Sequence, residues 1–378
     1  MSAALMHQSH FVEAHDILFF RGNKLFGEAG SFGDVAMPPS PSVISGALRS
    51  SLLSHDRFSF SDFKTIAHPA LGTASAPGSF VVRGFSLARR RNGSVEPVFA
   101  LPADLTVVND EMLGIEVRKA TPQKVHEKLQ SSSMAEFLPI LAEAERTKAL
   151  KGFWLDHKGW KAYLNGEKVL GSQLVPTNKL WLTESRVGIG MSTKTGTVED
   201  GKLFTSEAVC PLTDVGFVVH TSGADLSELH TLRFGGDGRA ARIKTLQPNQ
   251  LITPEPDYEK IATSKRLKLV LTSPGLFDEG WRPTGVNQEW RFELGNVKGQ
   301  LVCAAVSQNE VVSGFDLARW MPKPAERAVS TGGTYWLGNV EASAADLRKL
   351  ANTGLWFEQA HNTARRVEGF NAVAVCAW

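Results

Sequence analysis

The sequence has little cysteine. Its 378 residues contain three, Cys210, Cys303 and Cys376, which lie far apart and form no CxxC pair. An odd number of widely spaced cysteines argues against a disulfide framework. Proteins without such a framework are typical of reducing compartments, so we expect a cytoplasmic protein.

Long apolar runs are missing as well. The first residues show no basic region followed by an apolar stretch, as a secretory signal would. No run of apolar residues approaches the ~20 that a membrane-spanning helix needs. We therefore expect neither a signal peptide nor a membrane partner.

Neither sign of charge is in excess. Lysine and arginine number 41 and aspartate and glutamate 39, which leaves a formal net charge of +2. The protein is therefore not a polycation that attracts nucleic acid by its overall charge. Any binding of RNA or DNA would depend on local basic patches.

The motifs of several enzyme classes are also missing. The sequence has no GxxxxGK[ST] phosphate loop, no GxSxG nucleophile elbow and no HExxH zinc motif. The ten histidines and three cysteines do not cluster with the spacing of metal ligands. We expect no metal site, no cofactor and no small-molecule substrate.

Glycine, in contrast, is abundant, with 34 residues spread along the chain. Many glycines stand beside arginine, lysine, threonine or serine. Hydrophobic residues make up 42% of the chain, which is ample for a core. The pattern is typical of a β-rich protein with tight turns and binding surfaces lined by backbone.

Two blocks of predicted elements follow each other. In the first, we expect a strand within residues 10–20, a helix within 42–54 and a hairpin within 80–101 that turns at Asn92-Gly93. Residues 121–150 carry two helical patterns, and residues 156–180 read as a helical or irregular connector. The second block begins near Leu180. Its expected elements are strands at 186–191, 202–209, 216–220, 266–272, 300–306, 333–337 and 370–377 and a short helix at 226–232.

These elements predict an α+β fold of two units with antiparallel sheets. The first unit would span residues 1–179, with a helical or irregular insertion around 106–179. The second would span residues 180–378 and contain a glycine-rich loop. A doubly wound parallel sheet is not expected, because the elements form no long series of βαβ repeats.

One candidate anion site lies near the start of the first expected helix. Ser45 and Arg49 share a helix face because they are four residues apart, and Gly46 lies between them. Free N–H groups and the helix dipole favour phosphate near a helix start. The alternative is that Ser45 and Gly46 only permit close helix packing.

Another candidate is the expected hairpin at 186–204, whose tip is polar and contains glycine. Its candidate residues are Arg186, Met191, Thr193 and Lys194. Lys194 would contact phosphate, and the alternative is a solvated loop preceded by an ordinary core methionine.

The short segment 234–239 offers a third candidate. Gly235, Gly236 and Arg239 could cradle phosphate groups with backbone and guanidinium donors. The alternative is a tight turn with solvated charges.

The stretch from residue 312 to 337 is the strongest candidate for a nucleic-acid grip. A stiff Pro-Lys-Pro and a second basic residue precede a Gly-Gly turn and an aromatic strand. Glycine lets backbone approach a ligand closely, and lysine and arginine suit a phosphate chain. The candidate residues are Lys323, Arg327, Thr331, Gly332 and Gly333. The alternative is a crossover loop that is stiffened by proline and binds nothing.

Several segments, taken in order, resemble one protein family. They are DILFFRGNKLF (16–26), PPSPSVISGALRS (38–50), FALPADL (99–105), RVGI (186–189), TGTVEDGKLF (195–204), LRFGGDGR (232–239), the 312–337 stretch and GFNAVAV (369–375). Together they resemble the third-subunit family of the Cmr complex, the type III-B CRISPR effector, within the RAMP superfamily. The matches span most of the chain and are poorest at 106–180.

This resemblance implies tandem ferredoxin-like folds of the RNA-recognition type. It implies an RNA-binding subunit that holds the 5′ repeat-derived tag of the guide RNA (crRNA) and does not cut RNA. The large polymerase-like subunit and other Cmr RAMP subunits would be its partners in antiviral defence. The 186–204 hairpin would be thumb-like, with Met191 displacing a base. Arg21 and Lys24, in the first matched segment, join the RNA-binding candidates.

Two alternatives remain open. Some RAMP proteins cut guide-RNA precursors with an amino-terminal histidine, and here His15 precedes Asp16, so His15 could act as a general acid or base. Arg21 and Lys24 would then stabilise the transition state. The other alternative is a scaffold whose basic loops contact protein, and this contact would depend less on salt than phosphate binding does.

Overall fold

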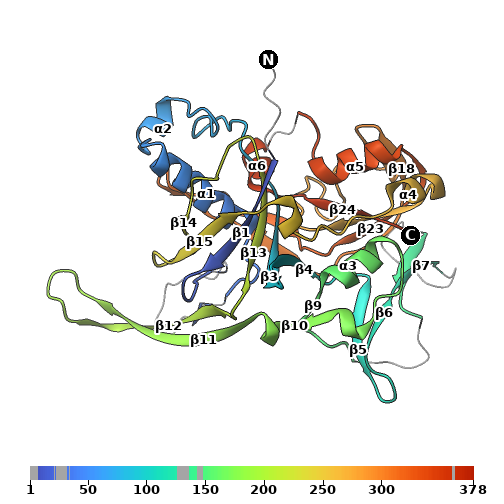
Figure 1. Ribbon diagram of the computed structural model, residues 1–378, viewed down its shortest axis with the longest axis horizontal. Helices are drawn as coiled ribbons and strands as arrows, with labels where there is room; N and C mark the ends of the chain where they lie inside the picture. The colour runs from blue at the N-terminus through green and yellow to red at the C-terminus, as the bar shows by residue number, and fades with distance from the viewer. Residues whose placement is uncertain are drawn as a thin grey trace.

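The computed structural model describes residues 7–20, 22, 32–33, 35–125, 136–142, 148–359 and 362–378. Strands predominate over helices (Figure 1). The helices are α1 (Pro41–His55), α2 (Asp62–Thr65), α3 (His157–Leu164), α4 (Tyr258–Ser264), α5 (Ala344–Thr353) and α6 (Thr363–Glu368). None of these helices, within the part of the chain described, has both the length and the apolar character needed to cross a bilayer.

A first sheet of eight strands has the order β10-β9-β4-β3-β13-β1-β15-β14. Its strands are β1 (His7–Ala14), β3 (Val81–Arg91), β4 (Ser94–Ala100), β9 (Phe153–Leu155), β10 (Leu174–Pro176), β13 (Val215–Ser222), β14 (Thr231–Arg233) and β15 (Ala240–Thr245). The antiparallel register aligns Phe11 with Val218 on one side and with Lys244 on the other. Buried Leu48 and Leu52 of α1 belong to the same core cluster as Phe217.

The second sheet has five strands in the order β17-β18-β23-β16-β24. They are β16 (Leu267–Leu271), β17 (Arg291–Leu294), β18 (Val297–Ala305), β23 (Thr334–Glu341) and β24 (Val373–Cys376). Leu347 and Leu350 of α5 pack with buried Leu269 and Tyr335 in a core cluster of their own.

The remaining strands form hairpins outside the two large sheets. They are β5 (Leu105–Asp110) with β6 (Gly114–Lys119), β7 (Thr121–Lys124) with β8 (Phe137–Ile140), β11 (Trp181–Met191) with β12 (Val198–Pro211), β19 (Asn309–Val312) with β22 (Glu326–Val329) and β20 (Phe315–Asp316) with β21 (Met321–Pro322). The short strand β2 (Phe32–Gly33) runs parallel to β12.

Most of the expected elements are present. The helix expected at 42–54 is α1, and the hairpin expected at 80–101 is β3 and β4, with Asn92 and Gly93 at positive φ in the turn. The hairpin expected around 186–209 is longer than its pattern indicated, since β11 and β12 extend from Trp181 to Pro211. A short helix was expected at 226–232, but the chain there forms turns and then β14.

The helical patterns at 121–150 do not correspond to helices in the described residues. Thr121–Lys124 and Phe137–Ile140 form an antiparallel pair instead. Pro122 and Pro139 face each other in this pair, and a proline in the interior of a helix removes a hydrogen bond and clashes with the preceding turn. The described part of the insertion is therefore mainly strand, with α3 as its helix.

The first sheet takes strands from both sides of the expected boundary at 179/180. The strands β13 and β15 flank β1 although they lie beyond residue 180. The chain passes from the first sheet to the second between β15 and β16. The insertion packs on the second sheet, because Leu155 and Trp160 share a core cluster with Val270 and Cys376.

Candidate nucleic-acid interface

The β11–β12 hairpin projects away from both sheets as a long ribbon (Figure 1). If another layer covered one face of β11, every second side chain of this strand would be buried. Instead, Val187, Ile189 and Met191 have exposed fractions of 69%, 50% and 58%. The register shifts between Ile189 and Met191, which marks a bulge near the tip. The ribbon therefore presents an apolar stripe to solvent.

Polar residues complete this ribbon. Thr193 and Lys194 are exposed in its tip, which closes through hydrogen bonds from the backbone N–H of Ser192 to the Thr197 carbonyl and of Gly196 to the Ser192 carbonyl, both 2.9 Å. Arg186 is exposed in β11, with its Nε 3.4 Å from Glu184. The structure thus brings Arg186, Met191, Thr193 and Lys194 onto one projecting element.

Gly188 lies under an aromatic ring of this ribbon. A Cβ placed on Gly188 would stand 2.4 Å from the ring of Phe204, its partner across the strands. Only glycine leaves room for the ring to cover the backbone at this point. The ring contact therefore gives the ribbon a fixed shape midway along its length.

The candidates on α1 are placed differently from the expectation. The helix begins at Pro41, so Ser45 and Gly46 lie beyond the first turn, where the N–H groups are already paired. Ser45 is fully buried, and Gly46 is exposed with open space around it. Ser45 and Gly46 therefore do not lie at the free N–H groups of the helix start, and a role for them in RNA binding stays a prediction.

Arg49 is largely enclosed by protein. It donates from Nη2 to the Leu71 carbonyl at 3.4 Å, and its Nη1 is buried without a hydrogen-bond partner. Burial lowers the pKa of Arg49, and the carboxylates of Glu368 and Asp316 partly oppose this shift. Arg49 is therefore largely enclosed, with the Leu71 carbonyl as its hydrogen-bond partner, and does not offer a free guanidinium to solvent.

The segment 234–239 packs against Phe19 and Phe20. Gly236 donates its backbone N–H to the Phe19 carbonyl at 2.8 Å, and a Cβ on Gly235 would stand 2.7 Å from the same oxygen. Arg239 lies over the Phe19 ring, with Nη1 3.2 Å from the Asp16 carboxylate. The donors of this loop are largely used inside the protein.

The Gly332-Gly333 turn joins three parts of the chain. Gly332 has a φ of +93° and donates to the Leu271 carbonyl at 2.8 Å. A Cβ on Gly332 would stand 2.7 Å from the Leu101 carbonyl oxygen. Both glycines are buried, and Thr331 is half-buried beside them. The close approach that glycine permits here is to the protein's own backbone.

The two basic residues before this turn differ in their surroundings. Lys323 donates from Nζ to the buried carboxylate of Glu368. Arg327, on β22, is exposed, and its side chain makes no hydrogen bond or ion pair with other described residues. Arg327 is therefore available to an external partner, whereas Lys323 is already paired.

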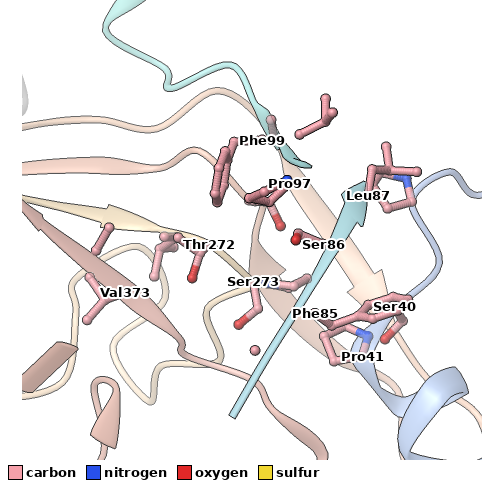
Figure 2. Close-up of a pocket in the computed structure, with 18 of the residues that line it drawn as sticks. Ser40, Pro41, Phe85, Ser86, Leu87, Pro97, Phe99, Thr272, Ser273 and Val373 are labelled. Carbon is pink, nitrogen blue, oxygen red and sulfur yellow. The ribbon is translucent and has the colours of Figure 1, made fainter. Parts of the chain in front are cut away.

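A cavity of about 830 Å³ lies between the two sheets (Figure 2). Hydroxyl groups of Ser86 and Ser273 and the aromatic ring of Phe99 line it, as Figure 2 shows. The described residues around it include Glu255 and Glu310 but no lysine or arginine, and burial raises the pKa of Glu310. A phosphate chain would find no cation among these lining residues, so the ribbon is the better RNA-binding candidate.

The pair His15-Asp16 does not form a catalytic dyad in this structure. His15 is exposed, and the Asp16 carboxylate contacts Arg239 instead. Arg21 and Lys24, the other candidates in this region, lie outside the described residues. Across the part of the chain described, no group of three histidine, cysteine, aspartate or glutamate residues is arranged to hold a metal ion.

Sequence reasoning found Met191 but missed the other two apolar side chains of the ribbon, Val187 and Ile189. Val187, Ile189 and Met191 alternate along β11, and this pattern predicts a strand with one buried face. Nothing in the pattern shows that the face stays uncovered. The signals of a free ribbon were the polar tip of the expected hairpin at 186–204 and the thumb-like shape that the family resemblance implied for it.

Comparison with known proteins finds solved structures with a similar fold. Two chains from cryo-EM structures of the type III-B Cmr-beta, one bound to cognate target RNA and one bound to cognate target RNA and AMPPnP, each superpose with a TM-score of 0.50. Their identities to this chain are 13% and 14%, they cover 97% of it, and the matches span 96% and 98% of their own lengths. No curated protein matches the sequence. The family model described as CRISPR-associated protein (Cas_Cmr3) matches residues 11–378. The chain is therefore a member of the Cas_Cmr3 family of CRISPR-associated proteins.

Proposed function

We propose that this chain is the RNA-binding subunit of a type III-B CRISPR effector complex that holds the 5′ tag of the guide RNA. The observation that carries the proposal is the exposed β11–β12 ribbon with Arg186, Met191 and Lys194. Family membership over residues 11–378 supports it. The two similar chains come from Cmr complexes bound to target RNA, which supports it too.

The strand orders support tandem ferredoxin-like units. In both β3-β13-β1-β15 and β18-β23-β16-β24, the first strand lies between the third and the fourth, and the second strand lies beside the third. This order is that of the βαββαβ ferredoxin-like motif. α1 provides the first crossover of the first unit, and α5 the second crossover of the second. We place the units at residues 7–245 and 267–376, with 101–211 inserted in the first.

The ribbon can hold single-stranded RNA in two ways. Arg186 and Lys194 supply cations for phosphates, and this contact is sequence-independent. Met191, Ile189 and Val187 supply an apolar edge that can separate stacked bases, as apolar wedges do when they enter between base steps. Thr193 adds a hydroxyl for a 2′-hydroxyl or phosphate contact.

The proposed role involves no RNA cleavage by this subunit. A metal-independent ribonuclease needs a positioned general base, and Asp16, which would have to orient His15, contacts Arg239. The large polymerase-like subunit and other Cmr RAMP subunits would be its partners. Catalysis would belong to those partners.

Tag-dependent binding tests the proposal. Binding of the purified chain to guide RNA with and without the 5′ tag would be measured as a function of salt. We expect Arg186→Ala/Lys194→Ala to weaken binding and to reduce the salt slope by about one unit for each lost phosphate contact. We expect Met191→Ser to weaken binding to tagged RNA without changing that slope.

The matched control is Lys260→Ala, which removes an exposed lysine from α4, on the opposite side of the molecule from the ribbon (Figure 1). The proposal fails if tagged and untagged RNA bind equally, or if the ribbon variants and the control behave alike. RNA recovered from the same samples would be checked for cleavage. Cleavage that is lost in His15→Ala would favour the nuclease alternative.

A further inference from the structure

The chain between β19 and β22 forms a second, smaller hairpin. β20 and β21 pair Phe315 with Pro322 and Asp316 with Met321, and we name residues 315–322 the apolar knob. The exposed fractions of Phe315, Leu317, Trp320 and Met321 are 48%, 48%, 76% and 52%. Half of the side chains in the knob are therefore apolar and open to solvent.

The turn at the end of the knob is held in one conformation. The Asp316 carboxylate accepts hydrogen bonds from the backbone N–H groups of Ala318 and Arg319, both at 3.0 Å. The Ala318 side chain is buried in the core cluster of the first sheet. Trp320 has a φ of +55°, which is uncommon for a bulky side chain and needs support from its surroundings. The knob is thus a fixed turn with one buried anchor.

Phe315 and Trp320 contact each other on the outside of this turn. Their rings meet edge to face, with centroids 5.5 Å apart and planes at 90°, a favourable arrangement for two aromatic rings. Trp320 nevertheless keeps 76% of its surface exposed. Ordered, clustered apolar side chains that remain in contact with water mark interaction sites.

A largely buried network of charges fixes the base of the knob. Arg365 donates to Glu326 at 2.7 Å and to Glu368 at 3.1 Å, and Lys323 pairs with Glu368 as well. The backbone N–H of Lys323 donates to the Gly314 carbonyl at 2.9 Å. The cation that follows the knob is thereby directed inward, away from any ligand that would contact the rings.

We infer that the apolar knob docks into an apolar pocket on another protein subunit, with carboxylates on the rim of that pocket. The inference rests on the proposed function, because it takes the chain to be one subunit of a larger complex. The carboxylate rim follows from charge complementarity. The exposed cations at the knob are Arg319, which is 53% exposed with its Nε 3.8 Å from Asp316 Oδ2, and Arg327 on the stem strand β22. The Asp316 carboxylate also accepts hydrogen bonds from its own turn.

The knob suits protein better than RNA. Its two rings, Phe315 and Trp320, meet edge to face and so do not form a pair of parallel faces for stacked bases. Tryptophan and arginine, in contrast, are enriched among the residues that dominate protein–protein binding energy. A fixed turn also loses little conformational freedom on binding, which favours tight docking.

Two separate measurements test this inference. The first is assembly of the purified chain with the other purified Cmr subunits without RNA, followed by light scattering and titration. The second is binding of the isolated chain to tagged guide RNA. The test variant is Phe315→Ser/Trp320→Ser, and Arg319→Glu/Arg327→Glu tests the rim. The control is Met112→Ser/Leu113→Ser, which removes two exposed apolar residues from the β5–β6 hairpin.

We expect the knob variant to assemble at least tenfold more weakly, as loss of a dominant contact would cause, with RNA binding and melting temperature unchanged. The charge reversal should slow association, and the control should assemble normally.

Normal assembly of the knob variant would overturn the inference. Loss of RNA binding by the isolated knob variant would overturn it in favour of base stacking. A wild-type chain that fails to assemble with the other subunits would overturn both this inference and the proposed role as a subunit, whereas tag-independent RNA binding would affect only the proposed function.

Discussion

Lys268 Nζ lies 3.0 Å from Asp104 Oδ2, and both side chains are completely buried. Lys268 belongs to β16 of the second sheet, whereas Asp104 follows β4 at the start of the insertion. The Tyr163 hydroxyl donates to the other carboxylate oxygen of Asp104 at 2.6 Å, and Lys268 lies over the Tyr163 ring. The pair therefore joins the insertion to the second sheet.

Breaking this pair from one side should be costly. We expect Lys268→Met to lower the free energy of unfolding by about 3–5 kcal/mol, because it leaves a buried carboxylate without its cation. Urea unfolding followed by circular dichroism measures the loss. Lys298→Met is the control, since Lys298 forms an exposed pair with Glu293 on the same sheet, and exposed pairs contribute little. Equal effects of the two substitutions would contradict the assignment of a structural role to the buried pair.

Two histidines should make the stability depend on pH. Burial lowers the pKa of His10 to about 4, with a further effect of His220, and burial lowers the pKa of His220 to about 4 as well. The neutral ring of His10 contacts the hydroxyl groups of Thr245 and Thr221. The unfolded chain takes up protons near pH 6.5 while the folded chain does not, so stability is full above that pH and falls progressively toward pH 4.

The expected loss between pH 7 and pH 4.5 is on the order of 1–3 kcal/mol per histidine. Urea unfolding at a series of pH values measures it. His10→Gln/His220→Gln should flatten the curve, although it should also lower stability at neutral pH. A wild-type curve that is level between pH 7 and pH 4.5 would show that these rings accept protons without penalty.

The glycine turn should tolerate no side chain at one position. We expect Gly332→Ala to destabilise the protein by about 2 kcal/mol or more, because the new Cβ would meet the Leu101 carbonyl oxygen at positive φ. Gly196→Ala is the matched control, since Gly196 also has positive φ but has open space around it, and it should cost about 1 kcal/mol. Thermal unfolding compares the two. Similar losses would mean that the Leu101 contact relaxes freely.

Substitutions of the two basic residues before this turn, Lys323 and Arg327, should differ in their effect on stability. We expect Lys323→Ala to destabilise the protein by about 1–3 kcal/mol, because Glu368 loses one of its two cations. Arg327→Ala should leave the melting temperature unchanged, because its side chain is exposed and unpaired among the described residues. Calorimetry of both variants checks this. A stable Lys323→Ala variant with impaired RNA binding would restore Lys323 as a direct RNA contact.

The local elements of this fold could be predicted from the sequence, because their signals are local. The Asn92-Gly93 turn and the helical spacing at 42–54 depend on neighbouring residues only. The β7–β8 pair could not be predicted, because its stability comes from a partner strand rather than from the helical pattern of its own residues. The family resemblance supplied the expectation of two tandem ferredoxin-like units, which no local pattern contains.

The candidate site was predictable only where side chains project into solvent. The exposed positions of Arg186 and Lys194 could be predicted because a hairpin with a polar tip has a recognisable pattern. The partner of Lys323 was not, since Glu368 lies 45 residues away along the chain. In the same way, the oxygen that excludes a Cβ at Gly332 belongs to Leu101, so a glycine that the sequence presents as a ligand contact is a contact between strands of the protein itself.

The position of β1 in the first sheet determines when this protein can begin to fold on the ribosome. His7 pairs with Ser222, and Phe11 with Lys244, so the amino-terminal strand leaves the exit tunnel more than 200 residues before its two neighbours. Non-local pairing of this kind is slow, and an unpaired strand edge invites wrong partners in the meantime. β1 therefore stays unpaired until β13 has emerged, and its second edge is covered only when β15 follows.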